Sequence, residues 1–202
     1  MSRFLAPIHQ IMYNKIMLQE QLTDRILEYA DRIGQSEVRA AVAGKYGEAD
    51  RRPLEESIDL QNIHGWLESR IGGAERRYAC AVTLLLAGHP ERLGQLQEQV
   101  RVFGAEHPAE EGISAGQALD YFNLNLLNGM PCDRVIEVCG SDAQKVVYRE
   151  LIDKHSDFWT EAGGDGENYY ILRTALVSGM LGSAFEYVKN DNDEYEIRKA
   201  AA

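Results

Sequence analysis

The chain lacks a long run of apolar residues. Its longest apolar stretches, residues 79–88 and 174–185, fall short of the roughly 20 residues that a membrane-spanning helix needs, and charged residues flank both. The N-terminal sequence MSRFLAPIHQ also has no apolar core of the kind that a secretory signal peptide contains. We therefore expect a soluble, cytoplasmic protein that does not enter a membrane.

Cysteine and positive charge are also scarce. The 202 residues include three cysteines, Cys80, Cys132 and Cys139, an odd number that indicates reduced thiols instead of a disulfide framework. Lysine and arginine total 21 against 32 acidic residues, which gives a net charge of -11. Because nucleic acids and anionic membranes attach to positive surfaces, the composition predicts neither of these partners.

Common catalytic and metal-binding motifs are missing. The sequence has no H-E-x-x-H, H-x-x-x-H or Cys-x-x-Cys pattern, and it lacks the paired E-x-x-H motif of di-iron bundles. Residues 112–116 match G-x-S-x-G, but a polar loop precedes Ser114 where a nucleophile elbow needs a strand. We interpret Ser114 as a helix cap. Residues 191–193 resemble part of a calcium loop but lack its glycine and its distal glutamate.

What the chain does contain is helical periodicity, most clearly in residues 58–88. Apolar residues recur there at steps of three and four, which places them on one face of a helix. They are Leu60, Ile63, Leu67, Ile71, Ala74, Tyr78, Ala81 and Leu85. Gly72 and Gly73 predict a kink or a close helix crossing, because two glycines weaken a helix. Gly88 and Pro90 mark the end of the helix.

Similar spacing predicts helices along most of the remaining chain. The segments are residues 3–33, 37–43, 91–104, 114–127, 141–162 and 167–189, with residues 132–139 left open between a short helix and an extended piece. We therefore predict an all-α fold, an up-and-down bundle of five to six main helices. Residues 1–189 form one domain in this prediction, and residues 190–202 form an acidic, flexible tail. Small residues in the last helix favour close packing, including a homo-oligomer.

Chain direction then suggests where a site forms. His9 and His64 lie near the starts of two long helices, and they meet only if these helices run parallel. Residues 34–57 are long enough to return over the required distance of about 36 Å. If the following helices alternate in direction, the helix expected over residues 141–162 ends on the same side of the bundle, and His155 lies there with His9 and His64. Glu68 follows His64 by four residues and shares its helix face.

These residues predict a pocket at one end of the core. His9, His64 and His155, with Glu68 in support, are the candidate ligands of a divalent transition metal. The candidate ligand-binding residues around them are Tyr13, Trp66, Trp159, Tyr170 and Arg173. Arg173, alone in an apolar stretch, either pairs with a buried carboxylate or binds an anionic ligand. The leading hypothesis is a protein that binds a metal ion or a small molecule, with metal-assisted catalysis left open.

Two alternatives remain from the sequence. The first is an interaction or oligomerisation module without a small-molecule site, in which each histidine is a hydrogen-bonding residue at the edge of the core. The second is a thiol-dependent enzyme that uses Cys132 as its nucleophile. Pro131 precedes this cysteine and favours a helix start, a position that lowers the pKa of a thiol. The neighbouring Asp133 opposes that effect.

Overall fold

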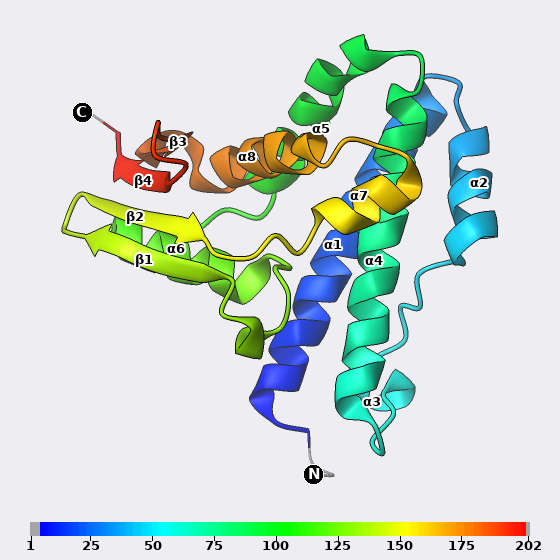
Figure 1. The fold of residues 1–202 in the computed structure, drawn as a ribbon, viewed down its shortest axis with the longest axis horizontal. Helices are drawn as coiled ribbons and strands as arrows, with labels where there is room; N and C mark the ends of the chain where they lie inside the picture. The colour runs from blue at the N-terminus through cyan, green and yellow to red at the C-terminus, as the bar shows by residue number, and fades with distance from the viewer. Residues whose placement is uncertain (1–4, 201–202) are drawn as a thin grey trace.

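The computed structural model of the protein describes residues 5–200. In this part of the chain, eight α-helices and three short 3-10 helices combine with four β-strands (Figure 1). The α-helices are α1 (Pro7–Arg32), α2 (Glu37–Tyr46), α3 (Leu54–Ser57), α4 (Ile63–Leu86), α5 (Leu93–Ala105), α6 (Ala115–Asn125), α7 (Ser156–Ala162) and α8 (Glu167–Leu181). The 3-10 helices are η1 (Pro90–Arg92), η2 (Pro131–Asp133) and η3 (Gly182–Ala184). The strands are β1 (Ile136–Ser141), β2 (Lys145–Glu150), β3 (Phe185–Lys189) and β4 (Tyr195–Lys199).

The prediction of an all-α bundle is wrong, because the four strands form an antiparallel sheet. The helix expected over residues 141–162 is instead the β1–β2 hairpin followed by the short helix α7. In β2, Val146 and Tyr148 are buried while Lys145 and Arg149 are exposed. This alternation, in a run of β-branched and aromatic residues, is typical of a half-buried strand. Residues 190–202, expected as a flexible tail, contain β4.

Side-chain caps in two turns explain where the hairpins reverse. Asp142 Oδ1 accepts hydrogen bonds from the backbone N–H groups of Gln144 and Lys145, at 2.7 and 2.9 Å. Asn190 Oδ1 does the same for Asn192 and Glu194, at 2.9 and 3.0 Å. Asp and Asn stabilise turns through such local bonds. The Asp- and Asn-rich segment 191–193 is therefore a hairpin turn.

The sheet has the strand order β1-β2-β4-β3, with one face on the helices and the other in solvent. Its inner face packs on α6 and α8 and presents Val146, Tyr148, Tyr187, Tyr195 and Ile197, all of which are buried. Its outer face has cross-strand ion pairs, in which Arg149 donates to Glu137 and Arg198 donates to Glu186, both at 2.8 Å. Paired charges of this kind suit a solvated sheet face.

The helical half is built on α1 and α4, which run parallel to each other (Figure 1). Tyr13 stacks on Trp66 near the starts of both helices. Further along, the buried Glu20 pairs with Arg77. The earlier residue of α1 contacts the earlier residue of α4, and the later contacts the later. The two helices therefore run in the same direction. One hydrophobic core continues from these helices to the inner face of the sheet, and a smaller one lies at the starts of α1 and α4.

Helix α4 continues without interruption through Gly72 and Gly73. A Cβ atom at Gly72 would lie 2.9 Å from Arg76 Nη1, and one at Gly73 would lie 3.2 Å from Arg77 Nη2. The two glycines therefore provide room for the two arginine side chains, which form ion pairs with α7 and α1.

Helices α5 and α8 cross closely. A Cβ atom at Gly104 would clash with the backbone of α8 at Leu176, and one at Gly179 would clash with the backbone of α5 at Arg101. Glycine at both positions lets the two backbones touch. The crossing fixes α8, which bears several of the candidate site residues, against the rest of the helical half.

Candidate functional site

Four of the predicted site residues meet at the starts of α1 and α4. The rings of His9 and His64 lie edge to face with their centroids 6.4 Å apart, and those of Tyr13 and Trp66 stack at 6.5 Å. Glu68 is exposed, one turn after His64 in the same helix. The parallel course of the two helices thus brings distant parts of the sequence together, as the direction argument requires.

The hydrogen bonding of His9 does not favour metal binding. Its Nδ1 accepts a hydrogen bond from the Ala6 backbone N–H at 3.1 Å, so a neutral ring has its proton on Nε2. A metal-bound histidine normally shows the reverse arrangement, in which the nitrogen not bound to metal donates a hydrogen bond. Among residues 5–200 there is no group of three or more His, Cys, Asp or Glu side chains with the geometry of a metal site.

His155 lies elsewhere and is almost completely buried. Its Nδ1 is 3.2 Å from Glu75 Oε1, and its Nε2 is 3.2 Å from Asn128 Oδ1. Its ring stacks on Tyr169 with a centroid distance of 3.7 Å. Glu75 follows His64 by eleven residues in α4, a rise of about 16 Å. The structure therefore does not bring His155 to His9 and His64.

Other predicted ligand-binding residues gather around His155. Trp159 is fully buried, and its ring is 6.4 Å from that of Tyr169. Tyr170 lies 6.5 Å from His155 by ring centroid, in an edge-to-face arrangement. The set proposed from the sequence as one pocket is therefore divided into two clusters, one at the starts of α1 and α4 and one beside α8.

Arg173 is the polar centre of the second cluster. Its Nη1 donates a hydrogen bond to Glu150 at 2.6 Å, which ties α8 to the end of β2. Its Nε is buried and has no hydrogen-bond partner in the described residues. The arginine therefore has a carboxylate partner, as the sequence suggested as one option, but this carboxylate is only partly buried. One donor of the arginine, Nε, stays unused among the described residues.

Tyrosine side chains surround this ion pair. The hydroxyls of Tyr148 and Tyr187, from the inner face of the sheet, are 2.8 Å apart. Burial raises the pKa of Tyr169 well above its ordinary value, and the nearby Arg173 opposes that effect only in part. Burial likewise raises the pKa of Tyr148 and of Tyr187. All three tyrosines therefore remain neutral hydrogen-bonding groups over the physiological range.

Arg173 also borders an open groove of about 280 Å³ between α1 and the sheet half. The lining residues come from α1, the end of α6 and the segment that leads into β1, and they are mainly apolar. They are Ile8, Ile11, Lys15, Phe122, Asn123, Leu124, Leu126, Asn128, Gly129, Met130, Pro131, Arg134, Val135, Ile136 and Arg173. Three of them, Lys15, Arg134 and Arg173, are cationic, and none is a carboxylate. We call this site the cationic groove.

Lys15 is the unusual member of the cationic groove. Only 8% of its surface is exposed, and it makes no hydrogen bond or ion pair with the described residues. Burial lowers the pKa of Lys15 from its ordinary value of 10.5. The sequence analysis did not identify this residue. The available signal was its position on the apolar face of the first helix, four residues after Ile11 and three before Leu18.

The wall of the groove formed by residues 126–136 is held in place. Asp133 Oδ2 accepts a hydrogen bond from the Met130 backbone N–H at 2.8 Å and pairs with Lys154 at 3.1 Å. The backbone N–H of Leu151 donates to the carbonyl of Val135 at 2.7 Å. His155 supports the same wall through Asn128. The groove is therefore formed before any ligand arrives, which reduces the entropy that binding must overcome.

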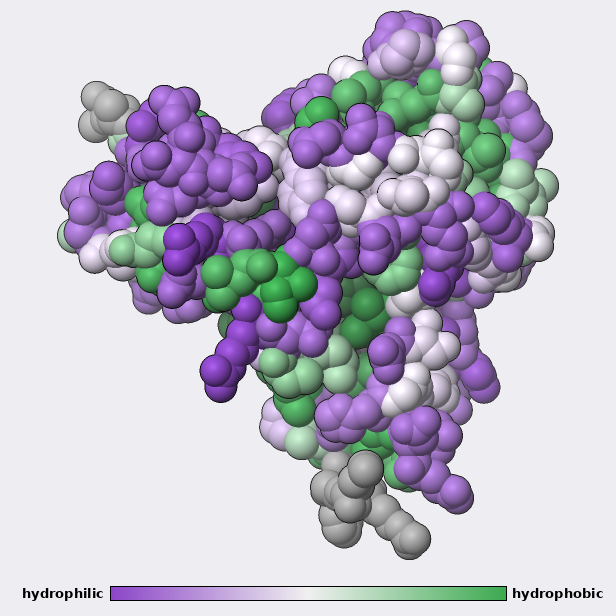
Figure 2. All heavy atoms as spheres, viewed as in Figure 1, coloured by the Kyte–Doolittle hydropathy of each residue, from purple (hydrophilic) through white to green (hydrophobic). Residues whose placement is uncertain are grey.

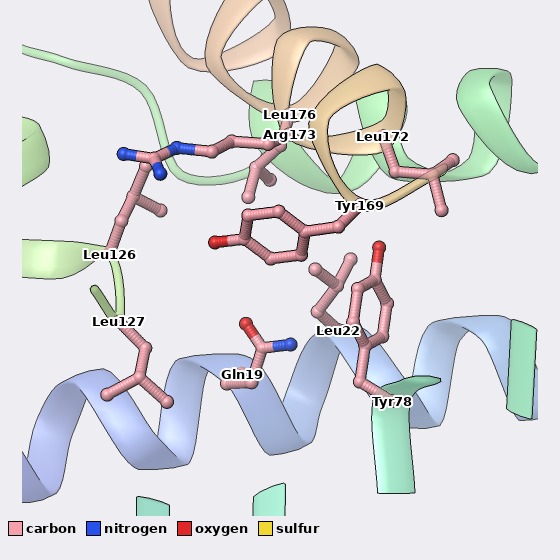
Figure 3. Close-up of a pocket in the computed structure, with 9 residues that line it drawn as sticks. All are labelled: Gln19, Leu22, Tyr78, Leu126, Leu127, Tyr169, Leu172, Arg173 and Leu176. Carbon is pink, nitrogen blue, oxygen red and sulfur yellow. The ribbon is translucent and has the colours of Figure 1, made fainter. Parts of the chain in front are cut away.

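Behind the cationic groove lies a small inner pocket, which shares Leu126 and Arg173 with it (Figure 3). In Figure 3, the Gln19 amide and the Tyr169 hydroxyl face the enclosed space, and the Arg173 side chain extends above Leu126. Gln19 Nε2 is buried without a hydrogen-bond partner in the described residues. The cavity volume is about 20 Å³, enough for about one water molecule.

Cys132 lies at the rim of the cationic groove. It is exposed in the three-residue η2, directly after the groove residue Pro131. Cys139 is exposed in β1, whereas Cys80 is buried in α4, where burial raises its pKa. No described histidine hydrogen-bonds to Cys132.

Comparison with known protein families, with curated proteins and with solved structures finds no match for this chain. Within residues 5–200, no helix combines the length and the apolar character needed to cross a bilayer. The case for a function therefore depends on the geometry of the site.

Proposed function

We propose that the protein binds a small amphipathic anion in the cationic groove. The observation on which this proposal depends is a nine-tenths buried lysine that has no hydrogen-bond or ion-pair partner among residues 5–200. It lies in a groove whose described lining residues include two arginines, of which Arg173 pairs with Glu150, and no carboxylate. The first hypothesis offered a metal ion or a small ligand in a pocket formed by His9, His64 and His155. This proposal keeps the small ligand and places it in the cationic groove. We also propose that the protein acts in the cytoplasm, where its three cysteines stay reduced.

The charge of the groove supports an anionic ligand. The whole chain has a net charge of -11, so a groove with three cations and no carboxylate departs from the average surface. Partial desolvation of the Lys15 ammonium is unfavourable, because no residue in the described part of the chain supplies a counter-charge. A bound carboxylate would supply that counter-charge to Lys15.

The walls of the groove support an amphipathic ligand. Most lining residues are apolar, and two of them, Ile8 and Leu124, have 41% and 54% of their surface exposed. An aliphatic chain lying on these side chains would remove apolar surface from water. The volume of about 280 Å³ is at the lower end of the range for ligand pockets, so the ligand is small.

The direct test is isothermal titration calorimetry with octanoate as the probe and octanol as its neutral counterpart. We expect octanoate to bind and octanol to bind at least about tenfold more weakly, since a hydrogen bond to a charged group contributes about 1.5–3 kcal/mol. Lys15→Met should remove most of this preference for the anion. Lys45→Met, which changes an exposed lysine in helix α2, is the matched control and should bind as the wild type does.

Two results would overturn the proposal. One is equal affinity for octanoate and octanol, which would show that the cations do not recognise the head group. The other is octanoate binding that survives Lys15→Met unchanged, which would place the ligand elsewhere. Binding of neither compound, with the protein found as an oligomer, would instead favour the interaction module.

A further inference from the structure

The protein has six lysines, and Lys15 differs from the other five. Among the residues that the structure describes, it is the only lysine with a buried side chain. Lys145, Lys154 and Lys189 form ion pairs with carboxylates at the surface, whereas Lys15 has no carboxylate partner. Lys15 lines a cavity that opens to solvent. A primary amine in this setting is the arrangement that enzymes use for covalent attack on carbonyl compounds.

We propose that Lys15 forms an imine with an aldehyde or ketone that also bears an anionic group. The inference rests on the proposed function, because the anionic group would be held by the other cations of the groove, Arg134 and Arg173. The neutral amine attacks the carbonyl carbon, and a carbon–nitrogen double bond replaces the carbon–oxygen bond. The carbonyl oxygen leaves as water together with the two amine protons, so no oxidant or reductant is needed.

Three features of the groove suit this chemistry. Burial increases the fraction of Lys15 present as the free amine, because it lowers the pKa of the group. No carboxylate is among the described residues that line the groove, so none of these holds the amine in an ion pair. The apolar walls favour a carbonyl compound with an aliphatic part, because covering these side chains removes apolar surface from water. Arg134 remains to bind the anionic group of the substrate, and Arg173, whose Nη1 already pairs with Glu150, adds its positive charge. Both arginines stay charged at any physiological pH.

Reductive trapping of the wild-type protein tests the proposal. The probes are succinic semialdehyde, which has a carboxylate, and pentanal, a neutral aldehyde of similar length, each with cyanoborohydride. Peptide mass spectrometry then gives the labelling rate at Lys15 and at the exposed Lys45. Lys45 corrects for the intrinsic reactivity of each aldehyde. We expect the preference for the anionic aldehyde to be at least about tenfold greater at Lys15, and excess octanoate to suppress labelling there but not at Lys45.

The possible failures are distinguishable. If Lys15 stays unlabelled while Lys45 reacts, or if its labelling shows no preference for the anionic aldehyde, the imine proposal is wrong. If labelling fails in this way but octanoate still binds in calorimetry, the proposed function stands and only the imine proposal is wrong. When octanoate binding also fails, both fall together.

Discussion

At the scale of single residues, the groove depends on one residue whose placement is unfavourable without a ligand. Lys15 has only 8% of its surface exposed and no counter-charge among the described residues. Natural proteins tolerate such residues mainly where function requires them, and replacing them commonly increases stability. The free energy of unfolding of the ligand-free protein should therefore reveal how much stability the protein loses by keeping Lys15 for ligand binding.

We predict that Lys15→Met stabilises the ligand-free protein by about 0.5–2 kcal/mol near neutral pH. Because the pKa of Lys15 is lower in the folded protein than in the unfolded chain, the unfolded state binds more protons between the two values. Wild-type stability therefore rises with pH in that window, and the advantage of the variant should shrink as the pH approaches 10.5. Urea unfolding at several pH values measures this, with Lys45→Met as the control. If Lys15→Met is less stable than the wild type at neutral pH, the Lys15 ammonium contributes favourable interactions, which would contradict the prediction that it has no partner.

The sequence analysis identified some site residues and missed the most informative one. Arg173 was recognised because a single charge interrupts an apolar stretch, and the structure shows its carboxylate partner, Glu150. Lys15 was missed because long lysine side chains at the border of an apolar face usually reach solvent, so the pattern alone gave no reason to expect burial. His155 lies away from His9 because the chain after β1 does not follow the up-and-down course that the argument assumed.

At the scale of elements, glycine permits the close contact between α5 and α8. The sequence indicated close approach from small residues in the last helix, and Gly179 is where α5 and α8 meet. It did not indicate the partner, because the pattern of small residues on one helix does not identify the surface against which it packs. Arg173 lies two turns earlier in α8, so this contact also helps to position one side of the groove.

We predict that Gly179→Ala destabilises the protein by about 1–3 kcal/mol, because the added methyl group overpacks a contact between two backbones. Gly44→Ala is the matched control, since a Cβ atom there meets nothing within 4 Å in helix α2. It should leave stability unchanged or raise it by up to about 1 kcal/mol. Thermal unfolding of both variants measures the difference. Equal effects from the two substitutions would contradict the close crossing.

At the scale of the whole molecule, the protein is a helical half joined to a four-stranded sheet, and the groove lies where the two meet. The helices were largely predictable, but the sheet was not. Its strands are five or six residues long, and the apolar residues of β2 and the following loop happen to fit helical spacing as well. Exposed apolar residues in that loop, Leu151 and Ile152, belonged to the expected helix face and instead lie at the surface. The face of the molecule in Figure 2 is mostly hydrophilic, with separate hydrophobic patches.

The central claim is that an anion pairs with Lys15 in the groove, and the most direct measurement is the pKa of this one amine. NMR titration of protein labelled at the lysine side chains gives that value, with Lys15→Met assigning the signal. Without ligand, the pKa of Lys15 should lie below 10.5, because burial disfavours the charged form. Saturating octanoate should raise the pKa, because the bound carboxylate stabilises the ammonium, while octanol should not. A pKa of Lys15 that octanoate leaves unchanged at saturation would contradict the account.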